Sequence, residues 1–216
     1  RLVETGWTGR ASTDSTGYRL VRAYRLTLLE QVYGWFIAPC RAADPDFGES
    51  GRRQWEDVLW RLVTEQPPHL LDSRYRGWPE ACLAAVDQVV AELTADGRPL
   101  ATCTWGDRNN VKVRHFLSGA VPLLADWADM TPRPLPGDAH MPRFQSPGAG
   151  ASQRLVVSPG REERAIFHMP GGPSGHPQSP YYGAGHAEWE EGRPGPLLPG
   201  PARWILTLKP APAQPN

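Results

Sequence analysis

The chain of 216 residues has no excess of either charge, no long apolar run and few cysteines. Lysine and arginine together number 23, and so do aspartate and glutamate. This balance gives no reason to expect nucleic acid or an anionic membrane as an obligate partner. The longest apolar stretch, residues 20–38, is interrupted by Arg22, Arg25 and Glu30. We therefore predict no membrane-spanning helix and no membrane partner.

The three cysteines are Cys40, Cys82 and Cys103, and they lack the C-x-x-C spacing of zinc or redox motifs. We favour three buried thiols over one disulfide with a free thiol. The sequence opens with Arg1, without an initiator methionine and without the charged and apolar regions of a secretion signal. We therefore expect a portion of a longer protein.

The first part of the chain has apolar residues at a spacing typical of helices. Helices are predicted at residues 16–38, 53–70 and 78–94. Asp14 or Ser15 should cap the first helix, and Pro39 should end it. Pro79 suits the first turn of the third helix. The narrow apolar faces of these helices need a further surface to pack on, which another polypeptide can supply.

Proline dominates the second part, since 17 of the 24 prolines fall between residues 131 and 216. Short strands are predicted at residues 101–105, 111–116, 153–158, 164–169 and 204–209. Residues 131–150 should form a long surface connection without regular structure. The sequence thus predicts an α+β chain, mainly helical over about 1–98 and built of strands and long loops over about 99–216. Because so few strands leave open edges, residues 1–216 are not expected to form an independent domain.

A serine stands between glycines in the stretch GPSGH, residues 172–176. A nucleophile elbow requires G-x-S-x-G between a strand and a helix. Here His176 replaces the second small residue, and Pro177 and Pro180 oppose a helix. We therefore predict that Ser174 shapes a loop, following a strand that ends near Met169, and does not attack a carbonyl.

Histidines and acidic residues surround this serine. The histidines are His168, His176 and His186. They are eight and ten residues apart, which matches no helix-face or hairpin pattern of metal ligands. The acidic residues are Glu188, Glu190 and Glu191. They could serve acid–base chemistry, but a charge run before Gly192 is typical of a solvated helix end, with Trp189 anchoring that turn in a core. We predict no metal site in this chain.

The stretch CTWGDRNNVKVRHF, residues 103–116, predicts two strands joined by a tight turn, since Gly, Asp and Asn tolerate the backbone angles of turns. Asn109 or Asn110 could stabilise an oxyanion, and His115 could act as a base. Spacing alone favours turn and strand roles for all three. We therefore assign no catalytic residue to this chain and leave its substrate-binding residues unassigned.

Four segments, taken in order, resemble the penicillin acylase family. They are WTGRASTDSTGYRLVRAYR (7–25), TWGDRNNVKVRHFLSGAVPLL (104–124), PGDAHMPRFQSPGAGASQRLVV (136–157) and GGPSGHPQSPYYGAGHAEWEEGRPGPL (171–197). They are similar to that family's W-x-G…D-S, W-G…H, P-G-D…G-A-S-x-R-x-V and G-x-S-G-x-P-x-S-P-H-Y patterns. The last pattern is followed in the family by a Trp, a Gly and Pro-Leu.

The resemblance implies an N-terminal nucleophile hydrolase, built as an αββα four-layer sandwich from a precursor that cleaves itself. The family's nucleophile is the first residue of the β-subunit, usually Ser, which uses its own α-amino group as the base. Arg1 has neither hydroxyl nor thiol. We therefore expect the nucleophile, the oxyanion donors and any structural calcium on another chain or segment, and no cofactor in this chain.

The chain is then expected to be the C-terminal portion of a β-subunit in a heterodimer. Its partners would be the α-subunit and the N-terminal part of the β-subunit. Two departures from the family bear on the substrate more than on the fold. The S-P-H-Y pattern is S-P-Y-Y here, with Tyr181 in place of the histidine, and the Asp-Gln that usually follows is Ala184-Gly185.

The function implied by the resemblance is hydrolysis of an N-acyl amide, such as a β-lactam side chain or an acyl-homoserine lactone, and with it a role in antibiotic metabolism. One rival is a catalytically inert family member or scaffold fragment. Another is a stand-alone β-rich binding module, which would fold by itself. The nearly lysine-free composition, rich in Arg, Ala, Gly and Pro, indicates a GC-rich bacterial genome. Because family members are often exported, we expect a periplasmic or secreted protein rather than a cytoplasmic one.

Overall fold

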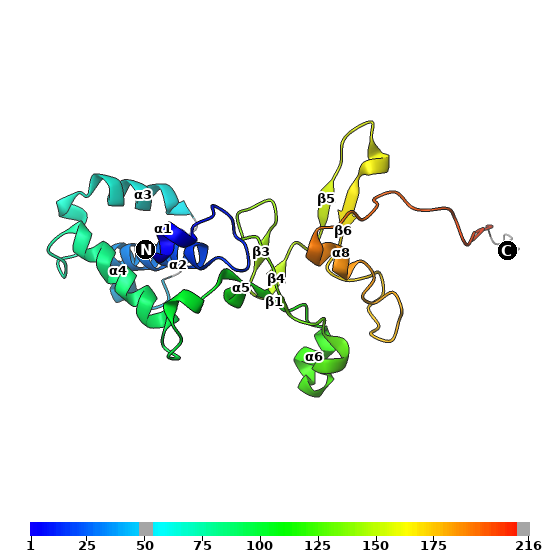
Figure 1. The fold of residues 1–216 in the computed structure, drawn as a ribbon, viewed down its shortest axis with the longest axis horizontal. Coiled ribbons are helices and arrows are strands. Elements are labelled where there is room, and N and C mark those ends of the chain that lie inside the picture. The colour runs from blue at the N-terminus through cyan, green and yellow to red at the C-terminus, as the bar shows by residue number, and fades with distance from the viewer. Residues whose placement is uncertain (48–53, 211–216) are drawn as a thin grey trace, which may run out of the picture. The chain divides into compact units, whose positions relative to one another are not determined.

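The computed structural model describes residues 1–47 and 54–210, and the chain divides into two compact units (Figure 1). Unit 1 comprises residues 1–111 and 132–148, and unit 2 comprises residues 112–131 and those from 149 onward. Helices and short strands occur together, as expected for the α+β class. No helix in the described part of the chain has both the length and the apolar character that crossing a bilayer requires.

Unit 1 is mainly helical. Its helices are α1 (Leu2–Gly6), α2 (Thr16–Ala43), α3 (Glu56–Glu65), the 3₁₀ turn η2 (Pro68–Leu70), α4 (Trp78–Leu93), η3 (Leu100–Thr102) and α5 (Trp105–Arg108). Its strands are β1 (Asn110–Val111), β2 (Arg133–Pro134) and β3 (Gln145–Ser146), of which β1 and β2 pair antiparallel. A core of seven buried residues joins α2, α3 and α4: Leu28, Leu29, Val32, Leu59, Leu62, Trp78 and Ala85.

The first and third predicted helices are confirmed, with one correction. The Ser15 hydroxyl caps α2 by accepting a hydrogen bond of 3.1 Å from the Tyr18 amide. Pro79 lies in the first turn of α4. The prediction that Pro39 ends the first helix is wrong, because α2 continues to Ala43. Pro39 is exposed, and its missing N–H leaves the Trp35 carbonyl without its helical donor.

The second predicted helix is shorter in the structure than in the sequence interpretation. It begins at Glu56 and ends at Glu65, and residue 53 lies outside the described residues. Gln66 follows with a left-handed φ of 51°, and Pro67 and Pro68 then open the turn η2. The indole nitrogen of Trp78 donates to the Pro67 carbonyl at 3.0 Å and thereby connects this turn to α4.

The predicted strand at 101–105 is wrong, and so is the interpretation of 103–116 as two strands around a tight turn. Residues 100–102 form η3, and Trp105 begins α5. The cause is a capping box: the Thr104 hydroxyl accepts from the Asp107 amide, and the Asp107 carboxylate accepts from the Thr104 amide. This local pair favours a helical turn over an extended chain.

Three other sequence predictions change in the structure. The strand predicted at 111–116 is reduced to β1, because His115 caps a new helix. The segment 131–150 is not only a surface connection, since it contains β2 and β3 and buries Leu135, Asp138 and Gln145. Three buried thiols were expected, but only Cys103 is buried, whereas Cys82 is half-buried and Cys40 is exposed near the end of α2.

Unit 2 combines short helices with one hairpin-like pair of strands. Its elements are α6 (Phe116–Ala120), η4 (Pro122–Leu124), α7 (Ala125–Ala128), β4 (Ala149–Gly150), β5 (Arg154–Val156), η5 (Glu162–Arg164), β6 (Ile166–His168) and α8 (His186–Glu191). Strands β5 and β6 pair antiparallel with Leu155 opposite Phe167, which confirms strands within 153–158 and 164–169. Residues 204–209 form no strand, so that prediction is wrong for the chain alone.

The αββα sandwich stays a prediction. Strands β1, β2, β5 and β6 are two or three residues long. Helix α8 ends before Gly192, which takes a left-handed conformation with φ 69°, and Trp189 is only 1% exposed, as predicted. The predicted solvated charge run is wrong for Glu190, which is 8% exposed.

Candidate functional site

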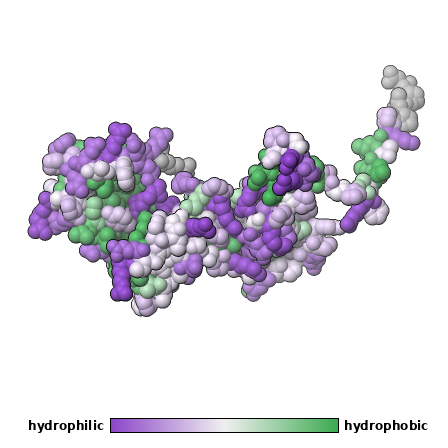
Figure 2. Space-filling model, turned by 45° about the horizontal axis from the view of Figure 1, so that its top comes forward, coloured by the Kyte–Doolittle hydropathy of each residue, from purple (hydrophilic) through white to green (hydrophobic). Residues whose placement is uncertain are grey.

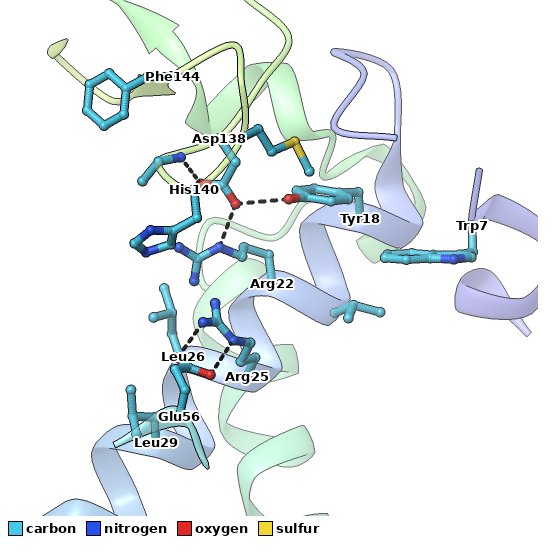
Figure 3. Close-up of a pocket in the computed structure, with 13 residues that line it drawn as sticks. Trp7, Tyr18, Arg22, Arg25, Leu26, Leu29, Glu56, Asp138, His140 and Phe144 are labelled. Atoms are coloured by element: carbon cyan, nitrogen blue, oxygen red, sulfur yellow. Dashed lines mark hydrogen bonds and ion pairs between the residues drawn. The ribbon is translucent and has the colours of Figure 1, made fainter. Parts of the chain in front are cut away.

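A groove of about 1070 Å³ lies in unit 1 along one side of α2 (Figure 3). Apolar and aromatic side chains form most of its walls: Trp7, Val21, Leu26, Leu29, Met141 and Phe144. Its polar groups are Tyr18, Arg22, Arg25, Glu56, Asp138 and His140. Arg25 pairs with Glu56 through two hydrogen bonds at one end of the groove. The groove thus combines apolar walls with neutralised ion pairs.

The buried carboxylate of Asp138 is the centre of this polar group. One of its oxygens accepts from the Tyr18 hydroxyl at 2.9 Å and from Arg22 Nε at 2.7 Å. The other accepts from the Ala139 amide at 2.6 Å. The Asp138 and Arg22 side chains are only 6% and 11% exposed. Figure 3 shows Tyr18 and Arg22, both on α2, pointing toward this carboxylate, which lies in the loop after β2.

The pKa values at Asp138 and Tyr18 shift in opposite directions. Burial alone would raise the pKa of the Asp138 carboxyl, but hydrogen bonds from Arg22, the Ala139 amide and Tyr18 hold it below its usual 3.8. Burial, followed by the hydrogen bond to Asp138, raises the pKa of Tyr18 from 10.0 to about 12. Asp138 is therefore ionised and Tyr18 protonated over the physiological range, and neither is poised to exchange a proton near neutrality.

Hydrogen bonds to and from Gly137, the residue before Asp138, connect this carboxylate to the start of α5. Trp105 Nε1 donates to the Gly137 carbonyl at 2.8 Å, and the Gly137 amide donates to the Ala11 carbonyl at 2.9 Å. The Tyr18 ring packs edge-on against Trp105, with centroids 4.9 Å apart. We call Tyr18, Arg22, Trp105, Gly137 and Asp138 the Asp138 cluster. Its members come from three of the four segments named above.

Gly137 must be glycine for two independent reasons. Its φ is +106°, which L residues rarely adopt. A Cβ atom at this position would also lie 2.4 Å from the Arg143 carbonyl oxygen. The P-G-D pattern thus has a structural role. Its glycine permits the turn, and the turn places the carboxylate of Asp138 against α2.

The structure gives Asn109 a structural role instead of that of an oxyanion donor. Its Nδ2 donates to the carbonyl groups of Leu135 and Gly137 at 2.8 and 3.1 Å. The side chain is completely buried, and its free Oδ1 is an acceptor that cannot stabilise an anion. Asn110 lies in β1, opposite Pro134. Asn109 therefore holds the loop that carries Asp138.

His115, in unit 2, holds a loop in place and does not act as a base. Its Nδ1 accepts from the Leu117 amide at 3.2 Å, which caps α6. Its Nε2 lies 3.0 Å from the Gly175 carbonyl, and because a carbonyl only accepts, Nε2 carries the proton. Both ring nitrogens are engaged by the backbone. His115 thus links α6 to the loop 171–182, which contains the GPSGH stretch.

Ser118 and Asp129 lie beside His115 without forming a catalytic triad. Ser118 Oγ is 2.5 Å from Asp129 Oδ1 and 2.7 Å from the His115 carbonyl. Hydrogen bonds from Ser118 and from the His115 amide hold the pKa of Asp129 below its usual value. A triad would need an imidazole nitrogen directed at the serine oxygen. Here the ring nitrogens bind Leu117 and Gly175, so that the three residues form a structural junction.

The structure places Ser174 in a loop, as the sequence predicts. Its Oγ accepts from the His176 amide at 3.2 Å, and no helix follows it before α8. His176 is exposed and accepts from the Gln178 amide through Nδ1. The loop is anchored by Tyr182, whose hydroxyl donates to the Ala128 carbonyl at 2.5 Å. Tyr181, the departure from the family pattern, is 61% exposed and is not this anchor.

The remaining histidines of unit 2 make structural contacts. His168 is buried, donates from Nε2 to the Arg193 carbonyl at 2.6 Å and faces Arg154 through Nδ1. His186 donates from Nδ1 to the Pro170 carbonyl at 2.6 Å, and its Nε2 lies 3.2 Å from the Glu190 carboxylate. Among residues 1–47 and 54–210, no three His, Cys, Asp or Glu side chains gather as metal ligands would. Calcium bound by a partner segment stays a prediction.

The residues that sequence reasoning missed are Tyr18, Arg22 and Asp138. No spacing rule reveals them, because Tyr18 and Asp138 are 120 positions apart. The available signal was the P-G-D stretch itself, in which glycine followed by a charged residue within a proline-rich segment marks a constrained turn.

Comparison with known proteins identifies a family. Residues 5–203 match the family model described as penicillin amidase. The penicillin acylase 2 proenzyme of Pseudomonas sp. (strain SE83) is 26% identical over 218 residues, which cover 92% of this chain and 26% of that protein. The chain thus spans about a quarter of that relative's length. The match over most of the chain shows that it belongs to the penicillin amidase family.

Proposed function

We propose that this chain is the C-terminal portion of a penicillin acylase-like amidohydrolase, which cleaves an N-acyl amide such as a β-lactam side chain or an acyl-homoserine lactone. The observation that carries the proposal is the Asp138 cluster. Three of the four segments that resemble the family meet there: Trp105 Nε1 donates to the Gly137 carbonyl at 2.8 Å, and Arg22 Nε donates to the Asp138 carboxylate at 2.7 Å. They form the framework of the family fold, and the αββα sandwich would be completed by the rest of the protein.

The reaction would begin on an N-terminal serine of another chain or segment. Its hydroxyl oxygen attacks the amide carbonyl while the α-amino group accepts the hydroxyl proton. Collapse of the tetrahedral intermediate expels the amine, which takes up that proton, and leaves an acyl-enzyme ester. Water then attacks the ester and releases the carboxylic acid. A nucleophile and base on another chain or segment agree with the structural roles of the candidate side chains here. Structural hydrogen bonds engage Ser174, His115, His168 and His186.

Two experiments on the full-length gene product test this proposal. The first is intact-mass analysis with N-terminal sequencing of every co-purifying polypeptide, where we expect a partner beginning with Ser, Thr or Cys. The second is labelling with a serine-directed sulfonyl fluoride, followed by peptide mapping. The adduct should lie on the partner's first residue, and Ser174→Ala should keep hydrolysis of an N-acyl nitroanilide within about twofold of the wild-type rate. An adduct on Ser174 would refute the proposal.

The inert-member alternative predicts a different result from the same material. An assembled protein that carries a free N-terminal serine but turns over no N-acyl amide would favour it. The replacement of the family histidine by Tyr181, which is 61% exposed, is the feature that gives this alternative weight. We also place the assembled bacterial protein in the periplasm or the medium, which fractionation of producing cells would test.

A further inference from the structure

Residues 203–209, RWILTLK, have no regular secondary structure in the described chain. None of their backbone groups forms a hydrogen bond with another described residue. Four large apolar side chains in this segment are almost fully exposed: Trp204 at 93%, Ile205 at 87%, Leu206 at 83% and Leu208 at 84%. Figure 2 shows a stretch of hydrophobic residues (green) close to the grey C-terminal residues. Such exposure is unusual for consecutive apolar residues in a soluble chain.

The order of residues specifies the structure that would bury them. Trp204, Leu206 and Leu208 alternate with Ile205, Thr207 and Lys209, so that a strand would have one apolar face and one mixed, mainly polar face. Tryptophan, isoleucine, leucine and threonine here are suited to strands, and no proline interrupts the segment between Pro201 and Pro210. Arg203 and Lys209 at its ends are typical of a strand at the edge of a sheet.

Both edges of strand β6 in unit 2 are occupied. Strand β6 already pairs with β5 on one side. On its other side it is bonded to residues 195–197, through Phe167 to Gly195 and through Leu197 to Ala165. Residues 195–197 therefore occupy the edge nearest in sequence to this segment. The matched relative is about four times longer than the stretch it shares with this chain, so that ample polypeptide remains to supply another edge.

We infer that residues 203–209 form an edge strand that pairs with a sheet of the remaining acylase polypeptide and directs Trp204, Leu206 and Leu208 into its core. Backbone hydrogen bonds would give the pairing its strength, and the three apolar side chains would fix its register. The inference rests on the proposed function for the existence of that polypeptide. It does not depend on catalytic activity.

The test is hydrogen–deuterium exchange of the full-length gene product, with all its co-purifying polypeptides. Amides of residues 204–209 should exchange at least roughly 100-fold more slowly than in the denatured protein. Leu206→Lys places a charge on the inward face and should reduce the recovered partner polypeptide at least about tenfold. Thr207→Lys is the matched control on the outward face and should leave recovery within about twofold.

Each other outcome has a definite meaning. Unprotected amides in an active assembly, or equal effects of the two lysine variants, would overturn the edge strand and leave the proposed function intact. Protection in an assembly without hydrolytic activity would support the strand and refute the proposed function. Purification of the chain without a partner polypeptide, including protection arising in a dimer of the chain with itself, would overturn the inference.

Discussion

At the scale of single residues, Asp138 differs from the other carboxylates that pair with arginine because its pair is buried. Its side chain and that of Arg22 are 6% and 11% exposed, whereas those of Asp96 and Arg98 are 54% and 45% exposed. A buried pair is held by strong Coulombic attraction in a poorly solvated environment, and loss of one partner leaves a buried charge without compensation. Water screens the exposed pair and weakens its contribution.

Asp138→Ala should therefore lower the free energy of unfolding by about 3–5 kcal/mol, because it leaves the Arg22 guanidinium buried and unpaired. Urea denaturation near pH 7 measures this change. Asp96→Ala is the matched control and should leave the midpoint unchanged. The double variant Asp138→Ala, Arg22→Met should recover part of the loss, since it removes the buried charge. Equal effects of the two aspartate substitutions would contradict this assignment.

Tyr18 makes the stability depend on alkaline pH. Its pKa is about 12 in the folded protein against 10.0 in the unfolded chain, so folding favours the protonated phenol. The contribution is complete below pH 10 and is lost as the pH rises toward 12. Tyr18→Phe should lower stability by about 1 kcal/mol at pH 7. It should also make the decline of stability between pH 9 and 11 shallower.

Urea denaturation at several pH values up to 11 tests the role of Tyr18. The decline should become shallower without disappearing, because burial, followed by the Cys82 contact, also raises the pKa of Tyr24 to about 12. Tyr181→Phe, at a side chain that is 61% exposed, is the control and should change stability little at pH 7. Parallel curves for wild type and Tyr18→Phe would show that the phenol does not make this contribution.

At the scale of elements, Pro39 shows how tertiary packing overrides a local signal. Helix α2 continues to Ala43 despite the missing N–H and the ring of Pro39, because Val32, Tyr33 and Ile37 are buried and hold the helix in place. Pro39→Ala should restore the N–H to Trp35 carbonyl bond of the helix and stabilise the protein by about 1–3 kcal/mol. Thermal unfolding measures the gain. Pro79→Ala, in a first turn that needs no such bond, should give none.

The same comparison shows what the sequence could and could not predict. Ser15 and Pro79 fix the starts of α2 and α4 through contacts within four residues, and both starts were predictable. The start of α5 depends on the balance between the Thr104 cap and the β-propensity of its neighbours, which a pattern cannot weigh. The role of Asp138 could not be predicted from the sequence, because its partners Arg22 and Tyr18 lie 116 and 120 positions away.

The junction of α6 with the loop 171–182 depends on the two ring nitrogens of His115. Asparagine at this position can still cap the helix but is too short to reach the Gly175 carbonyl. His115→Asn should therefore leave α6 protected and increase hydrogen exchange in the loop by roughly tenfold or more. His176→Asn, at an exposed position in the same loop, is the control. Equal exchange in the two variants would remove His115 as the anchor.

At the scale of the whole molecule, each unit exposes several large apolar side chains, more than the isolated ones that are normal on a protein surface. Trp60 and Leu83 in unit 1 are 72% and 64% exposed, and Phe116 and Leu123 in unit 2 are 77% and 94% exposed. Green residues are visible on the surface in Figure 2. Surfaces of this kind in a soluble protein mark contacts with other polypeptide. They agree with the proposal that this chain is one portion of a larger hydrolase.

The 216-residue chain expressed by itself should therefore bind a hydrophobic dye such as ANS and self-associate at micromolar concentration, because no other polypeptide covers these side chains. The full-length gene product should bind at least about fivefold less dye per copy of the chain. Dye fluorescence and sedimentation velocity provide the two measurements. A monomeric chain with low dye binding and cooperative, reversible unfolding would instead identify a stand-alone module. That result would count against the larger assembly, since a surface that needs no partner for solubility gives no reason to infer one.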